Sequence, residues 1–189
     1  MPRLFTALEL PDNMVSRLSL LRGKLPGARW IDPERYHVTL RFVGDVDAMT
    51  ARHFMSALAT IDSPSFELRL TGLGSFGGNK PRALWAGVEA SEPLMALQRA
   101  HERAARMAGL PAEPRNFMPH VTLARLNNTK PQMLAEYLSY YGGFFGEPFT
   151  VEGFVLFSSR ANQGGGPYLV EADYPFADSE SPGIAAGVL

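Results

Sequence analysis

Two identical tetrapeptides carry two of the four histidines in this chain of 189 residues. The first is His37-Val38-Thr39-Leu40, and the second is His120-Val121-Thr122-Leu123. At average amino-acid usage, a given histidine is followed by Val-Thr-Leu on the order of once in a few thousand cases. The repetition therefore indicates a pattern with a function.

The residue types in this pattern suit acid–base chemistry in a strand. Side chains alternate along a strand, so His37 and Thr39 share one face while the Val and Leu between and after them suit a core. His120 and Thr122 repeat the arrangement. One imidazole can take a proton while the other gives one, because the histidine pKa lies near neutrality. Hydroxyls can donate to oxygens that gain charge. In-line displacement at phosphorus has this symmetry.

Two arginines follow the tetrapeptides and are candidates for phosphate binding through a bidentate guanidinium. Arg41 lies four residues after His37, so on a regular strand it shares the face of that histidine. Arg125 lies five residues after His120 and points to the opposite face unless the strand bends or bulges.

Strands and helices alternate around the two motifs. We expect strands at residues 3–10, 36–44, 65–76, 82–90, 120–126, 149–160 and 167–176. We expect helices at residues 12–25, 48–61, 92–110 and 130–142.

The spacing of similar segments also indicates an internal duplication. Residues 4–9 resemble residues 84–89 position by position, and Phe66 and Phe149 each lie 29 residues after the motif histidine of their half (66 − 37 and 149 − 120). A pseudo-twofold axis between the halves would bring the two motif strands to face each other. We therefore expect an α+β fold of two pseudo-symmetric lobes, with antiparallel-rich sheets lining a central cleft and helices outside. Residues 1–176 would form this single domain, and residues 177–189 a flexible tail.

The composition excludes several classes of protein. The chain is 46% hydrophobic and 20% charged, with a formal net charge of −1, so no global field attracts nucleic acid or anionic lipid. The absence of cysteine excludes disulfides and thiolate sites. No apolar run approaches the ~20 residues of a membrane helix, and the N-terminus lacks the features of a signal peptide. We expect a cytoplasmic monomer without membrane contact.

Other candidate features have simpler interpretations. A zinc site would need more ligands than two histidines supply, so we expect no metal. His53 and His101 lie on expected helices and are interpreted as surface or boundary residues. Residues 72–77 fit the Gly-x-Gly-x-x-Gly pattern, but a strand and not a helix follows them, which excludes a dinucleotide site. Lys80 and Arg82 are interpreted as solvated hairpin charges, with a phosphate contact as the alternative.

The segments around the motifs resemble a known family. The segments are "RLFTALELP", "HVTLRFVGDV", "PRALWAGVE", "FMPHVTLAR" and "LFSSR…GGGPYLVEADYPF", which together extend over roughly residues 2–176. The paired H-x-T-x motif resembles the 2H phosphoesterase superfamily, and the flanking residues resemble its RNA 2′,3′-cyclic phosphodiesterase (2′-5′ RNA ligase-like) family. The resemblance implies a LigT-like fold.

The resemblance also implies an activity. It is the metal-independent and cofactor-free hydrolysis of a terminal 2′,3′-cyclic phosphate on RNA to a 2′-phosphomonoester, with reversible 2′-5′ ligation as the reverse displacement. By the same resemblance, His37 is the general acid, His120 is the general base, and Thr39 and Thr122 bind phosphate oxygens. Two alternatives remain: a 2H phosphoesterase acting on a small cyclic or 2′-5′ nucleotide ester, and a non-catalytic RNA-end binding protein.

Overall fold

The computed structural model describes residues 3–159 and 168–178. The strands are β1 (Arg3–Glu9), β2 (Ala28–Trp30), β3 (His37–Asp45), β4 (Phe66–Leu68), β5 (Leu70–Phe76), β6 (Ala83–Val88), β7 (His120–Leu126), β8 (Phe149–Val151), β9 (Gly153–Ser159) and β10 (Leu169–Pro175). The helices are α1 (Asp12–Ser19), α2 (Ala48–Leu58), α3 (Glu92–Met107) and α4 (Pro131–Tyr141), with a 3-10 turn η1 (Pro33–Arg35).

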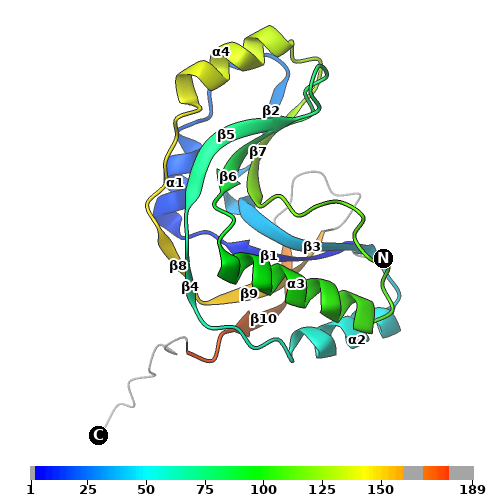
Figure 1. Cartoon of the computed structure of the whole chain (residues 1–189). Helices are drawn as coiled ribbons and strands as arrows, with labels where there is room; N and C mark the ends of the chain where they lie inside the picture. The colour runs from blue at the N-terminus through cyan, green and yellow to red at the C-terminus, as the bar shows by residue number, and fades with distance from the viewer. Residues whose placement is uncertain (1–2, 160–167, 179–189) are drawn as a thin grey trace, which may run out of the picture.

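Two four-stranded antiparallel sheets carry the motif strands (Figure 1). Sheet A has the order β10-β9-β1-β3, and sheet B has the order β2-β7-β6-β5. The first half of the chain supplies β1 and β3 to sheet A but sends β5 into sheet B, while the second half supplies β6 and β7 to sheet B and sends β9 into sheet A. The short strands β4 and β8, which directly precede β5 and β9 in the chain, pair with each other. The expected α+β fold of two pseudo-symmetric lobes is confirmed. Strands are exchanged between the halves, because β2 and β5 of the first half lie in sheet B while β9 and β10 of the second half lie in sheet A.

The structural register corrects the sequence alignment of the two halves. Thr39 pairs with Ala7, and its counterpart Thr122 pairs with Trp85. Ala7 is therefore equivalent to Trp85, whereas the sequence comparison matched it to Gly87. The alignment was wrong by two residues, a shift that keeps every side chain on its own face because the strand period is two.

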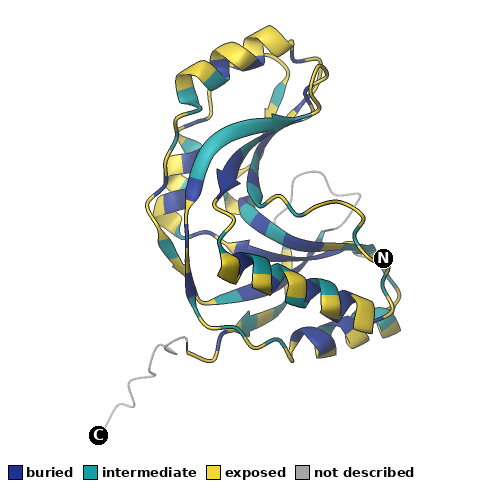
Figure 2. Ribbon diagram, viewed as in Figure 1, coloured by how far each residue is buried: buried dark blue, intermediate teal, exposed yellow. Residues whose placement is uncertain are grey.

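Helices cover the outer faces of the sheets, and one hydrophobic core extends through both lobes (Figure 2). Helices α2 and α3 pack against each other, and α3 lies on β3 of sheet A (Figure 1). Helix α4 packs against β5 of sheet B. On α3, His101 is fully buried against Phe154, so the interpretation of this histidine as a surface or boundary residue was wrong. His53 on α2 is exposed, as expected.

Differences from the expected elements are local. Helix α1 ends at Ser19 instead of residue 25, because the glycine and proline residues at positions 23, 26 and 27 interrupt the helical pattern. Leu21 and Leu25 are nevertheless buried, so their spacing reflects a loop packed on the core. The three-residue strand β2 was not expected, since so short a segment carries no periodicity.

The C-terminal end is described only in part. The expected flexible tail starts at residue 177, and residues 179–189 lie outside the described part of the chain. Within that part, Asp178 accepts hydrogen bonds from the backbone N–H and the hydroxyl of Ser65. In the described ranges, no helix is long and apolar enough to cross a membrane.

Candidate active site

A bulge in β3 separates the side chains of the first motif from Arg41. Thr39 pairs with Ala7 and Arg41 with Thr6, so Leu40 is the extra residue in the ladder. His37 and Thr39 remain half-buried on one face, whereas Arg41 turns to the core side and is 6% exposed. The expectation that Arg41 shares the face of His37 was wrong, because it assumed a regular strand.

Arg41 is held by partners on the side of the sheet opposite His37. Its Nε donates to the Glu102 carboxylate on α3 at 2.7 Å, and its other nitrogens donate to the carbonyl oxygens of Phe42 and Pro111. Glu113 lies 3.9 Å away. The guanidinium is therefore fully engaged within the protein, which argues against a role in phosphate binding.

An equivalent bulge in β7 has the opposite consequence for Arg125. Ala124 pairs with Leu84 and Thr122 with Trp85, so Leu123 is the extra residue. After the bulge Ala124 is buried and Arg125 is exposed, on the face that carries His120 and Thr122. The bulge that the sequence analysis named as a condition is present.

Each motif imidazole is oriented by a backbone carbonyl two residues before it. Nδ1 of His37 lies 2.7 Å from the Arg35 carbonyl oxygen, and Nδ1 of His120 lies 2.6 Å from that of Met118. A carbonyl can only accept, so Nδ1 carries the proton in both rings and Nε2 is left for chemistry. Nε2 of His37 lies 3.0 Å from the Thr39 hydroxyl.

The electrostatic environment couples the two histidines. Burial lowers the pKa of His37, and the charges of Arg35 and His120 lower it further, while the hydrogen bond to the backbone opposes the shift. Burial also lowers the pKa of His120, and Arg125 contributes in the same direction. Because the charge of His120 lowers the pKa of His37, protonation of one ring disfavours protonation of the other.

Aromatic rings hold both imidazoles in place. The His37 ring centroid lies 5.1 Å from that of Phe5 and 5.4 Å from that of Tyr168. The His120 ring centroid lies 5.0 Å from Phe76 and 6.2 Å from Trp85. These contacts restrict the rotation of both rings, so that each Nε2 keeps a fixed direction.

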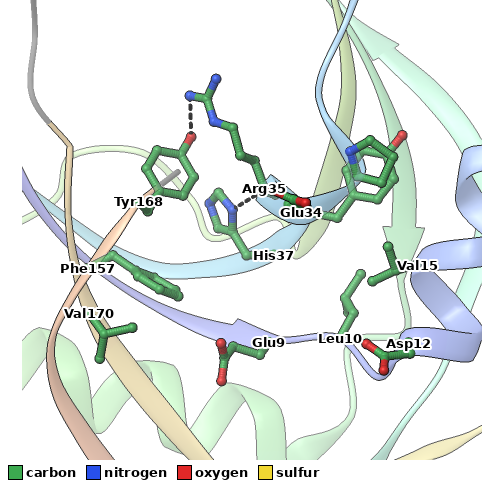
Figure 3. Close-up of a pocket in the computed structure, with 12 residues that line it drawn as sticks. Glu9, Leu10, Asp12, Val15, Glu34, Arg35, His37, Phe157, Tyr168 and Val170 are labelled. Carbon is green, nitrogen blue, oxygen red and sulfur yellow. Dashed lines mark hydrogen bonds between the residues drawn. The ribbon is translucent and has the colours of Figure 1, made fainter. Parts of the chain in front are cut away.

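A pocket of about 380 Å³ adjoins His37 (Figure 3). On one side Arg35 donates to the Tyr168 hydroxyl at 3.0 Å and lies 4.6 Å from the centre of that ring. Elsewhere the pocket is lined by the carboxylates of Glu9, Asp12 and Glu34. Sequence reasoning missed the Arg35–Tyr168 pair, because its members are 133 positions apart.

Of the remaining candidate residues, Thr122 lies beside His120, whereas Lys80 and Arg82 lie in a hairpin. Thr122 is half-buried beside His120 on β7. Lys80 and Arg82 are exposed in the hairpin between β5 and β6, and strand β6 follows the Gly-x-Gly-x-x-Gly segment, as expected. Within residues 3–159 and 168–178, no group of three or more His, Cys, Asp or Glu side chains could hold a metal ion.

Comparisons with known proteins give a consistent set of relatives. The model of the 2′-5′ RNA ligase superfamily matches residues 11–163. An RNA 2′,3′-cyclic phosphodiesterase of Aquifex aeolicus is 33% identical over 77% of this chain and 80% of its own length. The enzyme of that name from Aeropyrum pernix is 34% identical over 62% of this chain and 70% of its length. One from Geobacillus stearothermophilus is 35% identical over 64% of this chain, which spans only 41% of that longer protein.

Solved structures share the fold. E. coli LigT complexed with 3′-AMP superposes with a TM-score of 0.79 at 24% identity, over 94% of this chain and 99% of LigT. LigT in its apo form superposes with a TM-score of 0.75 at 26% identity, over 93% of this chain and 98% of LigT. The two-sheet arrangement is thus that of known structures.

Proposed function

Because this chain belongs to the 2′-5′ RNA ligase superfamily, we propose that it hydrolyses the 2′,3′-cyclic phosphate at the end of an RNA strand to a 2′-phosphomonoester. The relatives named RNA 2′,3′-cyclic phosphodiesterase support this substrate. The observation that carries the proposal is the pair of matched imidazoles, in which Nδ1 of each ring donates to a backbone carbonyl and Nε2 is the atom left for proton transfer, beside the Thr39 hydroxyl in the case of His37.

The reaction needs one proton removed and one delivered. His120 takes a proton from water at Nε2 as the oxygen attacks phosphorus, and His37 gives a proton from Nε2 to the departing 3′-oxygen as the P–O3′ bond breaks. The products are a 2′-phosphate and a 3′-hydroxyl. Afterwards His37 is neutral and His120 is protonated, and exchange with solvent restores the starting state.

The neighbouring polar groups stabilise the transition state in this proposal. The hydroxyls of Thr39 and Thr122 donate to the two non-bridging phosphate oxygens, which gain charge as water adds. Arg125 supplies positive charge on the His120 side. The carboxylates of the pocket beside His37 repel phosphate, so the cyclic phosphate lies between the histidines and not within that pocket.

An exposed ring is available for the terminal base. Phe42 follows the bulge in β3, lies on the face of His37 and Thr39, and is 46% exposed. Aromatic side chains stack on bases with little sequence preference. By contrast, Tyr36 is buried and Phe117 packs against the core, so the structure favours Phe42 among the aromatics that flank the motifs.

The direct test is product analysis with a short RNA that ends in a 2′,3′-cyclic phosphate, in the presence of EDTA. Wild-type protein should form a 2′-phosphate, and His37→Ala and His120→Ala should each lose at least about 1,000-fold in kcat/KM, the order expected for removing a general acid or base. The exposed His53 provides the control His53→Ala, which should retain full activity. Turnover that survives loss of either motif histidine would refute the mechanism, and binding without turnover would favour an RNA-end binding protein.

The assignment of acid and base has its own test. A substrate with sulfur in place of the 3′-bridging oxygen releases a thiolate, which needs no proton. His37→Ala should therefore recover most of its lost rate with this substrate, whereas His120→Ala should remain slow because water must still be activated. Recovery by His120→Ala instead would reverse the assignment.

A further inference from the structure

The Arg35–Tyr168 pair joins the two edges of sheet A on the face that carries His37 (Figure 3). Arg35 ends η1 at the edge formed by β3, and Tyr168 directly precedes β10, which forms the opposite edge. The Arg35 guanidinium lies 4.6 Å from the centre of the Tyr168 ring and donates to its hydroxyl at 3.0 Å. The two side chains therefore meet across β1 and β9, the strands that separate the edges in the sheet.

The Tyr168 ring packs on a small group of buried side chains beside His37. This group is separate from the main core and consists of Phe5, Ala7, Val155 and Phe157. Tyr168 meets the imidazole of His37 edge-on, with 5.4 Å between the ring centres and 85° between the ring planes. Phe5 lies 5.1 Å from His37 and 4.9 Å from Tyr168. The imidazole thus contacts two aromatic rings that also contact each other, and this packing limits its rotation.

Arg35 supports His37 through its backbone and through its side chain. The carbonyl oxygen of Arg35 accepts from Nδ1 of His37 at 2.7 Å. The guanidinium holds Tyr168, whose ring packs against the same imidazole. The first contact fixes the tautomer of the imidazole, and the second supports the plane in which the ring lies.

The Arg35 side chain takes this position although carboxylates line the same pocket. Glu9, Asp12 and Glu34 are part of the pocket lining, but none of the ion pairs in the described part of the chain includes Arg35. Nε of Arg35 is buried and has no hydrogen-bond partner. A cation that packs on an aromatic ring, forgoes nearby carboxylates and leaves an N–H unsatisfied is unfavourable for stability alone. The contact therefore indicates a role in the site for the position of Tyr168.

The second motif has no equivalent of this pair. Met118 takes the position of Arg35, two residues before the motif histidine, and is 55% exposed. Phe76 meets the His120 ring edge-on at 5.0 Å and 84°, much as Tyr168 meets His37. Neither of the cation–ring contacts among the described residues involves Phe76. The additional support is thus given to His37, the histidine that protonates the departing oxygen in the proposed mechanism.

We propose that Arg35 and Tyr168 are positioning residues for His37, which keep its Nε2 directed at the departing 3′-oxygen. This inference rests on the proposed function, in which His37 is the general acid. A general acid must lie within hydrogen-bond reach of the leaving oxygen, and a displacement of about 1 Å can lower a rate about 100-fold. Tyr168 acts through the packing of its ring on the imidazole, and Arg35 acts through Tyr168.

The test combines variants of the pair with two substrates that differ in the leaving atom. With the RNA 2′,3′-cyclic phosphate, Tyr168→Ala should lose about 100-fold in kcat/KM, and Arg35→Met, which keeps the backbone carbonyl, about tenfold. With sulfur in place of the 3′-bridging oxygen, both variants should stay within about threefold of wild type, because the thiolate departs without a proton. Tyr168→Phe, which keeps the ring, should stay within about threefold of wild type on both substrates.

The matched control is Phe76→Ala, which removes the corresponding ring from His120. This variant should remain slow with both substrates, because water must still be activated when the leaving group needs no proton. Normal turnover of the sulfur substrate by Tyr168→Ala would also show that the variant is folded. Equal losses of Tyr168→Ala on the two substrates would mean a general structural role and would overturn the inference.

Nitrogen NMR of the His37 ring separates this inference from the proposed function, because it needs no turnover. At a pH where the ring is neutral, wild-type protein should show the tautomer with the proton on Nδ1, whereas Tyr168→Ala should show a mixture of both tautomers. Identical ring shifts in the two proteins would overturn the positioning role. Absence of hydrolysis by wild type together with the expected change in the shifts would refute the proposed function and retain the support of His37 by Tyr168.

Discussion

At the scale of single residues, the two histidines share the same contact at Nδ1 and differ in their other surroundings. Each donates from Nδ1 to the carbonyl two residues before it. His37, however, has Arg35 and Tyr168 beside it, while His120 has Arg125 on its strand. Under the proposed function, the shared orientation at Nδ1 leaves Nε2 of each ring for proton transfer, and the unequal charges around the two rings should favour one direction of substrate binding.

The lowered pKa values of both histidines predict an acidic optimum for the free enzyme. The proposed mechanism needs one neutral and one protonated imidazole, so the plot of kcat/KM against pH should be bell-shaped between the two pKa values. Burial lowers both from the ordinary value near 6.5, so the maximum should lie below pH 6.5 and the rate should fall at higher pH. A pH–rate profile at low substrate concentration checks this.

The matched variant for that profile is Arg125→Gln. It removes one cause of the low pKa of His120, so the limb of the profile that belongs to this histidine should move to higher pH. A plateau that extends unchanged to pH 8 in wild type would contradict the coupling inferred from the structure.

At the scale of elements, two bulges decide which arginine faces the site. The sequence predicts the strands and the motif faces well, because His-Val-Thr-Leu alternates cleanly. It does not predict that Leu40 and Leu123 are extra residues in their ladders, since a bulge depends on the neighbouring strand. After its bulge, β3 turns Arg41 toward the core, whereas β7 exposes Arg125 on the face of His120. The sequence also does not predict that Arg29 pairs with Arg125, because strand β2 is too short to recognise.

The environment of Arg41 predicts a loss of stability when it is replaced. Arg41→Leu leaves the Glu102 carboxylate without its 2.7 Å partner and should lower the free energy of unfolding by about 2 kcal/mol. This is less than the roughly 3–5 kcal/mol of a fully buried broken pair, because Glu102 is partly exposed. Arg125→Leu should change stability by less than about 0.5 kcal/mol. Urea unfolding monitors both, and equal effects would show that Arg41 is not anchored as described.

Helix α3 contains a histidine that should make stability depend on pH. Burial lowers the pKa of His101 to about 4, whereas in the unfolded chain it lies near 6.5. The neutral ring stabilises fully above pH 6.5, and stability is lost as the pH falls from 6.5 towards 4 because the unfolded state binds the proton first. Between pH 7.5 and 5 this group should cost about 2 kcal/mol.

Two leucine variants separate His101 from the other titrating groups. His101→Leu should unfold with a smaller pH dependence than wild type over that range, while His53→Leu, on the exposed face of α2, should match wild type. An equal pH dependence in all three proteins would mean that His101 does not titrate in this window.

At the scale of the whole molecule, exchange of strands makes one folding unit from two similar halves. The duplication is visible in the sequence because both halves repeat their motif and spacing. The exchange is not visible, because the residue pattern of β5 or β9 does not tell which of the two sheets the strand joins. Each motif strand therefore lies in a sheet that is complete only with a strand from the other half.

This connectivity predicts that neither half folds alone and that the two halves complement each other. The exposed turn at Gly77–Gly78 joins β5 to β6, so a break there leaves fragments 1–78 and 79–189. The first lacks β9 for sheet A, and the second lacks the β5 edge of sheet B and the β1 partner of β9. Separately they should show no cooperative unfolding transition, whereas coexpressed fragments should copurify and recover hydrolysis. A fragment that unfolds cooperatively by itself would mean that its lobe is stable without the exchanged strand, and the halves would then be two domains.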